Sequence, residues 1–330
     1  MRFFVILFFT LSICFSQDEK YQLSTVAFYN VENLFDTVDD PNNGWDESMT
    51  PNGKDKWTEK KYKTKIDNLS KVIAGIGKET TNAHPTIVGL CEVENRNVLI
   101  DLVQSKNLKD FNYGIVHFDS PDWRGIDVAL IFDSKRFIPR KAKTYPLEVE
   151  YKGNPSYSRD ILVVFGFLDK EPINFIVNHW PSRSGGQAES EPQRVKAAEV
   201  NKRIIDSIQN IDINAKIISM GDFNDHPDDK SLKILTSTYN KEDIQTPGMF
   251  NPMQELSKRG RASYLFRGFP SAIDQFVISN GLISKNSNLV YLKADVYMKR
   301  FLYTQEGRYR GYPARSMSWG VFNPNGYSDH

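Results

Sequence analysis

The sequence has little cysteine and almost no net charge. Its 330 residues include two cysteines, and Lys and Arg total 42 against 41 for Asp and Glu. This balance leaves no global basic field of the kind that grips nucleic acid, so any polyanion must bind to a local patch. Internal repeats and low-complexity tracts are also absent from the sequence. The apolar and aromatic content is nevertheless that of a globular protein with a real core.

Only one apolar run is long, and it lies at the N-terminus. Residues 3–13 follow a basic residue and are too short to span a bilayer. Small residues come next, which predicts a signal peptide over residues 1–16 and a secreted or periplasmic domain over residues 17–330. Acylation of Cys14 as a lipoprotein is the weaker alternative, because the preceding Ile13 is bulky. No later stretch is long and apolar enough for a membrane helix.

Cleavage of the signal would leave Cys91 as the last cysteine, which excludes an intrachain disulfide. Cys91 precedes Glu92 on a predicted strand, so the two side chains should face opposite ways. A buried core thiol is the favoured interpretation. A nucleophilic cysteine is the alternative, but no neighbouring residue supports it.

Apolar runs and helical spacings alternate along the rest of the chain and predict one domain. Helices are expected over residues 57–76, with a run of solvent-facing lysines, and over 192–208. Strands are expected over residues 86–91, 128–132, 161–167, 173–178, 217–220 and 273–279. Some strands are close enough for hairpins, which favours mixed sheets with helices outside over an all-parallel fold. The Asp- and Asn-rich loop 36–53 could hold calcium, but its spacing fails the EF-hand pattern and favours a solvated loop.

Five segments share one pattern, in which acid, amide or histidine follows apolar residues. They are residues 28–32, 89–92, 176–179, 217–224 and 328–330. In open α/β sheets, ligands bind outside the carboxyl ends of strands. The five ends could therefore converge on one divalent metal and one phosphate.

Carboxylates and an amide in these segments suit a metal and an activated water. Glu92 and Asp329 are candidate ligands, because hard cations such as Mg²⁺ take carboxylate oxygens and keep waters for the substrate. Asp222 and Asn224 lie two residues apart, so an extended backbone would place both on one face. Such a pair could orient a water and hold a phosphate oxygen, whereas a plain Gly-Asp-Asn turn is the alternative.

Two of the five histidines have neighbours that are typical of a catalytic site. His179 follows a strand and precedes a loop with arginine and two glycines, and His330 follows an acid. Either could transfer a proton or stabilise charge at phosphorus. His84 and His117 are expected to be structural, and His226 to lie in a solvated loop.

Two further residues could support this chemistry. Asp274 begins a predicted strand and could orient the His330 imidazole, as carboxylates orient catalytic histidines elsewhere. Arg159 could bind phosphate, although a surface ion pair is the alternative.

Taken together and in this order, these motifs resemble the endonuclease/exonuclease/phosphatase superfamily, whose fold is that of DNase I. The motifs that carry the resemblance are NVENLFD (30–36), EVEN (92–95), RGIDVAL (124–130), NHWPSR (178–183), GDFN (221–224) and SDH (328–330). The likeness covers nearly all of the chain after residue 16 and is strongest to secreted bacterial endonuclease-like members. It implies an α/β four-layer sandwich, in which two mixed β-sheets pack face to face with helices on both outer sides.

The resemblance also implies a metal site. Glu92 would bind the metal, Asn30 and Glu32 would lie beside it with Asn30 near the phosphate, and Asp329 would complete the site. Magnesium is the expected ion, with manganese or calcium as alternatives.

The remaining roles implied by the resemblance concern the substrate. Asp222 would orient or deprotonate the attacking water, and Asn224 would hold the phosphate. His179 would contact the phosphate and assist the leaving group, while His330 would be paired with Asp274. Arg159 matches the phosphate-contacting arginine of the family.

The expected activity is that of a secreted metal-dependent phosphodiesterase, with an endonuclease on DNA or RNA favoured. Near-neutral charge supports the alternative of a phosphatase or a phospholipid or sphingomyelin phosphodiesterase. An inactive binding module is the third reading, and the intact constellation argues against it. The protein is expected to be a monomer. Because the family continues from Asp-His into a final strand, a strand after His330 is also expected.

Overall fold

The structure is a computed structural model that describes residues 22–330 except 42, 152, 285–286 and 319. The predicted signal peptide over residues 1–16, with Cys14, lies outside the described residues. No helix within the described ranges combines the length and apolar content needed to cross a bilayer.

The first sheet has four strands in the order β1-β2-β4-β3. Their bounds are β1 (Val26–Leu34), β2 (Ile87–Val93), β4 (Asp127–Asp133) and β3 (Tyr113–His117). β1 and β2 are parallel, and the other neighbours are antiparallel. Every residue of β4 is buried, as expected for a strand with packed layers on both faces.

The second sheet has six strands in the order β5-β6-β7-β8-β12-β9. Their bounds are β5 (Phe137–Tyr151), β6 (Asn154–Leu168), β7 (Glu171–His179), β8 (Ile217–Asp222), β12 (Asp274–Ser279) and β9 (Met249–Phe250). Only β7 and β8 are parallel neighbours. Both sheets are therefore mixed, which confirms the predicted fold class.

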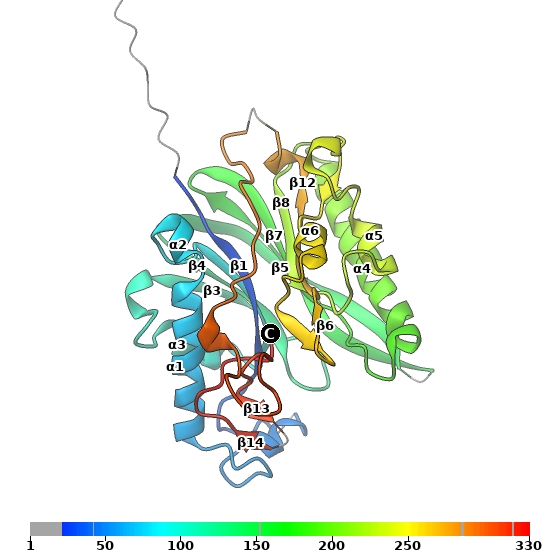
Figure 1. Cartoon of the computed structure of the whole chain (residues 1–330). Helices are drawn as coiled ribbons and strands as arrows, with labels where there is room; N and C mark the ends of the chain where they lie inside the picture. Colours follow the sequence, from blue (N-terminus) through cyan, green and yellow to red (C-terminus); the bar gives the residue numbers. More distant parts are fainter. Residues whose placement is uncertain (1–21, 42, 152, 285–286, 319) are drawn as a thin grey trace, which may run out of the picture.

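Helices cover the outer face of each sheet (Figure 1). The elements are α1 (Glu59–Gly75), α2 (Lys78–Thr81) and α3 (Arg96–Val103) beside the first sheet, and α4 (Gln187–Gln209), α5 (Lys230–Leu235) and α6 (Met253–Lys258) beside the second. Short 3₁₀ turns lie at Asp46–Met49, Lys109–Phe111, Lys241–Asp243, Asn280–Leu282 and Arg300–Leu302. Two small hairpins complete the fold: β10 (Tyr264–Phe266) with β11 (Phe269–Ser271), and β13 (Met317–Ser318) with β14 (Val321–Phe322).

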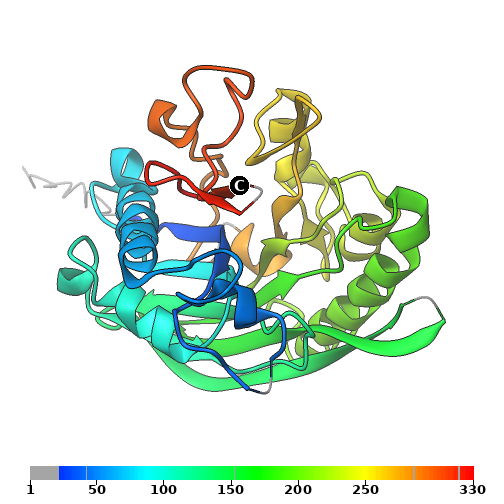
Figure 2. The same cartoon turned by 90° about the horizontal axis from the view of Figure 1, so that it is seen from below.

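Three apolar clusters define four layers. One joins α1 and α3 to the first sheet, a second fills the space between the sheets, and a third joins α4 and α5 to the second sheet. Seen from below, the C-terminus lies at one rim of the paired sheets, between segments coloured orange and yellow (Figure 2). The polar ends of β7, β8 and β12 meet one another in the second sheet.

Several details differ from the sequence prediction. Lys65, assigned to the wet face of α1, is fully buried and donates to the Glu32 carbonyl and to the Ser316 hydroxyl. Helix α4 begins at Gln187 rather than near Pro192. Its first turns are held by Arg194, whose buried guanidinium donates to the Ser190 hydroxyl and pairs with Asp225. The Ser190 contact lies within α4, whereas the Asp225 pair ties the helix to the segment after β8, and the helix continues through Pro192.

Candidate active site

Asp222 lies buried at the centre of the predicted site residues. It ends β8, where it pairs directly with His179 of β7 on one side and with Asp274 of β12 on the other. Because β7 and β8 are parallel, their carboxyl ends bring His179 and Asp222 to the same edge. β12 runs the other way, so its first residue, Asp274, meets them there.

One oxygen of Asp222 is shared by three side chains. Oδ2 accepts a hydrogen bond from Asn30 Nδ2 at 3.2 Å. It also lies 3.8 Å from Nε2 of His179 and 3.8 Å from Nε2 of His330. Glu92 Oε1 lies 3.9 Å from the same His179 nitrogen. The structure therefore brings together five of the predicted residues, from β1, β2, β7, β8 and the segment ending at His330.

The pKa values of the two histidines are shifted in opposite directions. Burial lowers the pKa of His179 well below its usual value, and the charges of Arg159 and Arg124 lower it further. Burial also lowers the pKa of His330, but Asp274 and Asp222 outweigh burial and raise it well above the usual value. At neutral pH one imidazole is neutral and the other is cationic, which is the pattern of a divided acid–base site.

Asp274 fixes the orientation of His330. Its Oδ2 lies 2.7 Å from Nδ1 of His330 and also accepts a hydrogen bond from the Ser263 hydroxyl. The ring of Tyr264 lies over His330 with a centroid separation of 4.8 Å. His330 Nε2 is consequently left to face Asp222.

Asp222 itself has a raised pKa. Burial raises the pKa of its carboxyl to about 7, with Asp274 and Glu92 adding to the shift and His330 opposing it. A carboxyl poised near neutrality can accept a proton from water at physiological pH.

Strained backbone gathers at this site. Glu32, Asn33, Glu92 and Asn224 all have positive φ, between 51° and 62°. Irregular pairing accompanies two of these positions, because the register shifts between Asn30 and Leu34 in β1 and between Cys91 and Val93 in β2. Such bulges turn a side chain out of the sheet's alternation, and strained residues concentrate at functional sites.

The prediction that extended backbone places Asp222 and Asn224 on one face is wrong. Asn224 has a φ of 52°, and its N–H donates to Asp222 Oδ1 at 2.9 Å. Its side-chain amide donates to the Trp180 carbonyl at 3.0 Å. Asn224 thus closes a tight turn that holds the Asp222 carboxylate in place.

The three carboxylates expected to bind metal are not gathered into one cluster. Glu32 Oε1 and Asp329 Oδ2 are both held by Arg315, at 3.0 and 2.7 Å. Glu92 Oε2 accepts from the Asn33 N–H and lies 3.7 Å from Arg124 Nη2. Among the described residues, the acid- and histidine-containing groups close enough to share an ion at this site combine Asp222 with Cys91 and His179, or with Asp274 and His330.

The donor chemistry nevertheless fits a divalent cation. Glu92 and Asp222 both reach within 3.9 Å of one atom, His179 Nε2, from opposite sheets. Asp329 and Glu32 bring further carboxylates. Burial raises the pKa of Glu32, and the charge of Asp329 raises it further. Excess carboxylate at a partly open edge suits a hard cation better than a soft one.

Arg159 does not face an open phosphate position. Its guanidinium pairs with Asp122 at 3.2 Å and donates to the Trp180 carbonyl at 2.7 Å. Its Nε has no partner within the described structure. Arg159 therefore braces the turn after His179, and its positive charge contributes to the lowered pKa of His179.

Four residues near the site received no role from the sequence: Lys65, Arg124, Tyr264 and Arg315. Arg124 donates a hydrogen bond to Asn33 Oδ1. Because Arg124 lies in one of the family motifs, the sequence could have indicated a role for it. Lys65, Tyr264 and Arg315 had none, because each reaches the site through tertiary packing from a distant part of the chain.

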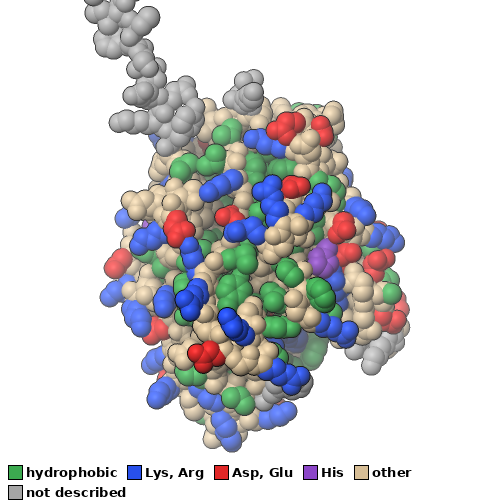
Figure 3. All heavy atoms as spheres, in the orientation of Figure 1, with side chains coloured by type: hydrophobic (Ala, Val, Ile, Leu, Met, Phe, Trp, Pro, Cys, Tyr) green, Lys and Arg blue, Asp and Glu red, His purple; other side chains and the backbone are tan. Residues whose placement is uncertain are grey.

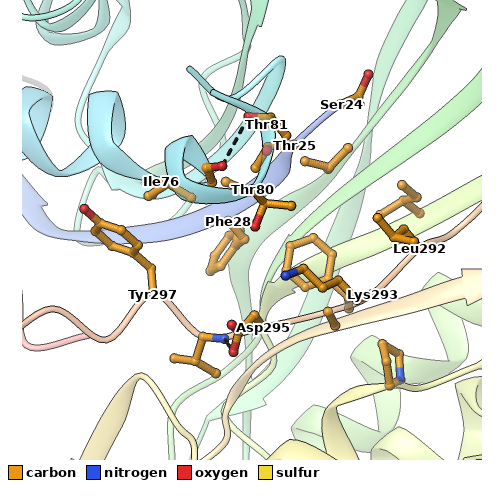
Figure 4. A pocket seen from close by; sticks show the side chains of 18 of the residues that line it. Ser24, Thr25, Phe28, Ile76, Thr80, Thr81, Leu292, Lys293, Asp295 and Tyr297 are labelled. Atoms are coloured by element: carbon orange, nitrogen blue, oxygen red, sulfur yellow. Dashed lines mark hydrogen bonds between the residues drawn. The ribbon is translucent and has the colours of Figure 1, made fainter. Parts of the chain in front are cut away.

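A cavity lies beside the site rather than over it. It has a volume of about 940 Å³ and runs from His330 along the outer edge of β1. Its walls include Phe28 and Ile76 on one side and Leu292 and Tyr297 on the other (Figure 4). β1 has no strand partner on this edge among the described residues.

The sequence matches the Endonuclease/Exonuclease/phosphatase family over residues 25–330. The chain belongs to this family, whose members are hydrolases that act on phosphoester bonds. No curated protein matched the sequence.

Solved structures similar to this chain include a mannosyl-6-phosphatase from Bacteroides thetaiotaomicron, at 17% identity and a TM-score of 0.47, covering 78% of this chain and 86% of that one. The human Nocturnin catalytic domain is similar at 16% identity and a TM-score of 0.45, covering 67% and 83%. A truncated Caenorhabditis elegans TDP2 is similar at 17% identity and a TM-score of 0.45, covering 66% and 79%. This chain spans 61% of a longer TDP2 chain.

Proposed function

We propose that this protein is a divalent-metal-dependent phosphodiesterase that hydrolyses nucleic acid, with an endonuclease as the favoured form. The observation that carries the proposal is the position of Asp222 Oδ2, 3.8 Å from each of two imidazoles with oppositely shifted pKa values. Family membership supplies the reaction type, hydrolysis of a phosphoester.

Asp222 would orient the attacking water and accept its proton, because its pKa near 7 allows proton uptake at physiological pH. Cationic His330, fixed by Asp274, would stabilise negative charge that develops at phosphorus. Neutral His179 would donate a hydrogen bond from Nε2 to a phosphate oxygen or to the leaving group. Asn30 would orient the Asp222 carboxylate by donating a hydrogen bond to Oδ2.

A bound divalent ion would neutralise phosphate charge and lower the pKa of a bound water. Glu92 and Asp329 are its proposed ligands, with Glu32 beside them. Magnesium is proposed, and manganese or calcium would also suit oxygen donors.

One observation favours a second candidate, hydrolysis of a small phosphoester or a phospholipid headgroup. The formal net charge is +1, and strong nucleic-acid binders usually carry a basic footprint. A purely adhesive role fits less well, because it would not need two neighbouring histidines whose pKa values are shifted in opposite directions.

We also propose that the protein acts outside the cytoplasm, on the basis of the apolar residues 3–13 at the start of the sequence. The expected monomeric state stays a prediction. Cell fractionation of the expressed protein, with mass spectrometry of its mature N-terminus, tests this proposal. Retention in the cytoplasm with residues 1–16 intact would contradict it.

The test of activity is incubation of the protein with plasmid DNA, RNA and sphingomyelin, each with and without EDTA. A His179→Ala variant prepared in parallel controls for contaminating nucleases. The proposal expects EDTA-sensitive cleavage of a nucleic acid that the variant has largely lost. EDTA-sensitive turnover of sphingomyelin alone would instead support the second candidate.

A further inference from the structure

We propose that the β10–β11 hairpin and residues 303–312, which face its tip, form a clamp for the unpaired bases of a nucleic acid strand. The clamp would select single-stranded nucleic acid as the substrate of the site, so this inference rests on the proposed phosphodiesterase function. Four observations carry it: the alignment of aromatic rings, their exposure, the arginines beside them and the link to His330.

The hairpin presents one aromatic face that starts at the catalytic cluster. Tyr264 and Phe266 alternate along β10, and Phe269 lies directly opposite Phe266 on β11, so the three rings share a face. Tyr264 packs against His330 with ring centroids 4.8 Å apart. Phe266 lies two residues further out, which is about 7 Å along the strand.

The outer rings are exposed, although their backbone forms a regular hairpin. Phe266 is 56% exposed and Phe269 is 74% exposed. The two residues between them, Arg267 and Gly268, have φ values of 51° and 88°, as a tight two-residue hairpin turn requires. The base of the hairpin is fixed to the site, because the Ser263 hydroxyl donates to Asp274. Large exposed rings on a short, pinned hairpin mark a contact surface.

Arginines accompany these rings. The guanidinium carbon of Arg267 lies 5.2 Å from the centroid of Phe266, and that of Arg308 lies 5.6 Å from the centroid of Tyr309, which is itself exposed. Residues 299–315 carry several basic side chains and a single acid, Glu306; the basic ones are Lys299, Arg300, Arg308, Arg310 and Arg315. Figure 3 shows blue and green side chains intermixed over one face of the molecule. Within this set Lys299 pairs with Glu79, and Arg315 pairs with Glu32 and Asp329. Arg308 and Arg310 are exposed, as is Arg267 at the hairpin tip, and these arginines give the nearly neutral protein a local basic character beside its site.

The second side of the clamp meets the hairpin tip. A Cβ added at Gly268 would lie 3.5 Å from the Tyr312 hydroxyl. Residues 303–312 are closed into a loop by an isolated bridge between Tyr303 and Pro313 and by the Thr304 N–H donating to the Tyr312 carbonyl. Figure 2 shows the two parts of the clamp projecting beside the C-terminus, the yellow hairpin on one side and the orange loop on the other.

This chemistry fits unpaired bases better than the other ligands of a phosphodiesterase. Aromatic rings hold single strands by stacking on base faces, and arginines add phosphate and cation–π contacts. Bases inside a duplex offer no free face to Phe266 or Phe269. A small phosphoester at Asp222 would not reach the outer rings. A lipid surface would accept the phenylalanines, but it gives no role to rings aligned in register with His330.

The experiment measures binding without turnover. Fluorescence anisotropy of a labelled oligothymidylate and of a matched duplex is recorded in EDTA at one fixed salt concentration. The variant is Phe266→Ala/Phe269→Ala, with melting temperature as the folding check. Ile138→Ala/Arg140→Ala is the matched control, since it removes an exposed apolar side chain and an arginine from the far end of β5.

The expected loss of single-strand affinity is roughly tenfold or more, the scale of losing one or two stacked bases. Duplex affinity and the control variant should change little. Phe266→Tyr should keep single-strand affinity and Phe266→Leu should lose it, because stacking needs a ring and hydrophobic contact does not. Equal affinity of parent and double variant for the oligothymidylate would overturn the clamp, as would an equal loss on duplex.

Two further readouts separate the clamp from its rivals. Hydrolysis of bis(4-nitrophenyl) phosphate reports the catalytic centre alone, and the double variant should retain it. Failure of the parent on this diester would overturn the proposed function but not the binding result. Loss of sedimentation with phosphatidylglycerol vesicles, with unchanged oligothymidylate affinity, would assign the hairpin to a lipid surface and overturn the clamp.

Discussion

Asp222 holds the central position because three strands and the segment ending at His330 meet at its carboxylate. Asn30, His179 and His330 all approach one oxygen, while the Asn224 N–H binds the other. The surrounding low dielectric makes each of these contacts stronger than it would be in water. Removing any one of these partners leaves a buried polar group of Asp222 unpaired, so turnover and stability should both fall.

The two histidines give the most direct prediction at this scale. His179→Ala and His330→Ala should each lower kcat by roughly 10²–10³-fold, the usual effect of removing a group that stabilises charge in the transition state. Steady-state kinetics on the best phosphodiester substrate is the measurement. His84→Ala is the control, because His84 stacks on Phe111 and pairs with Asp133 and has no role in the proposed chemistry. Near-normal turnover in either variant would remove that histidine from the mechanism.

A buried acid outside the site gives a prediction about pH and stability. Asp46 is buried, and one of its oxygens has no partner in the described structure. Burial raises its pKa from the ordinary value of 3.8, and nearby Asp39 and Asp40 add to the shift. The folded state therefore holds this proton more tightly than the unfolded chain, so stability falls as pH rises above about 4.

Asp46→Asn removes this titration and keeps an acceptor for the Asp40 N–H. The melting temperature of the variant relative to the parent should therefore rise between pH 4 and pH 7. Thermal melts at both pH values provide the comparison. A difference that stays constant with pH would show that the Asp46 carboxyl titrates normally in the folded protein.

Strand β2 shows how one element serves the core and the site together. Cys91 is fully buried in the layer between the sheets, and burial raises the pKa of its thiol well above normal. Glu92, the next residue, is turned toward the site by the bulge. The predicted core thiol is confirmed, since Cys91 is a buried free cysteine.

Thiol chemistry tests this arrangement of β2. The native protein should react with 5,5′-dithiobis(2-nitrobenzoic acid) far more slowly than the same protein in guanidinium chloride, because a buried thiol reacts only when the sheets separate. Rapid stoichiometric labelling under native conditions would contradict the packing between the sheets. A Cys91→Ala variant sets the background absorbance.

The sequence could predict elements with strong apolar patterns and not those shaped by tertiary contacts. The apolar positions of α1 and the runs of β2, β4, β7 and β8 were sufficient for placement. β5 went unpredicted, because its 15 residues mix lysines and prolines with apolar residues and are held by pairing with β6. The positive φ of Glu92 could not be predicted, because glutamate does not favour it locally, whereas the positive φ of Asn224 agrees with the Gly-Asp-Asn turn that the sequence left as an alternative.

The whole molecule places its catalytic groups by bringing two sheets together. Asn30 and Glu92 come from the first sheet, and His179, Asp222 and Asp274 from the second. Neither sheet carries a complete set, so the site exists only in the packed fold. The sequence order of the motifs predicted this convergence, whereas the pairing of Glu32 and Asp329 with Arg315 required the tertiary structure.

The central claim is metal-dependent hydrolysis of a phosphodiester at Asp222. Its most direct test is the initial rate on bis(4-nitrophenyl) phosphate and on plasmid DNA, measured for the parent and for Asp222→Asn. Each is assayed in Mg²⁺, in excess EDTA, and in EDTA followed by re-added Mg²⁺. The expected result is parent activity that EDTA abolishes and Mg²⁺ restores, with a rate at least roughly 10²-fold lower for the variant wherever Mg²⁺ is present. Full activity of the parent in excess EDTA, or an equal rate for Asp222→Asn, would contradict the account.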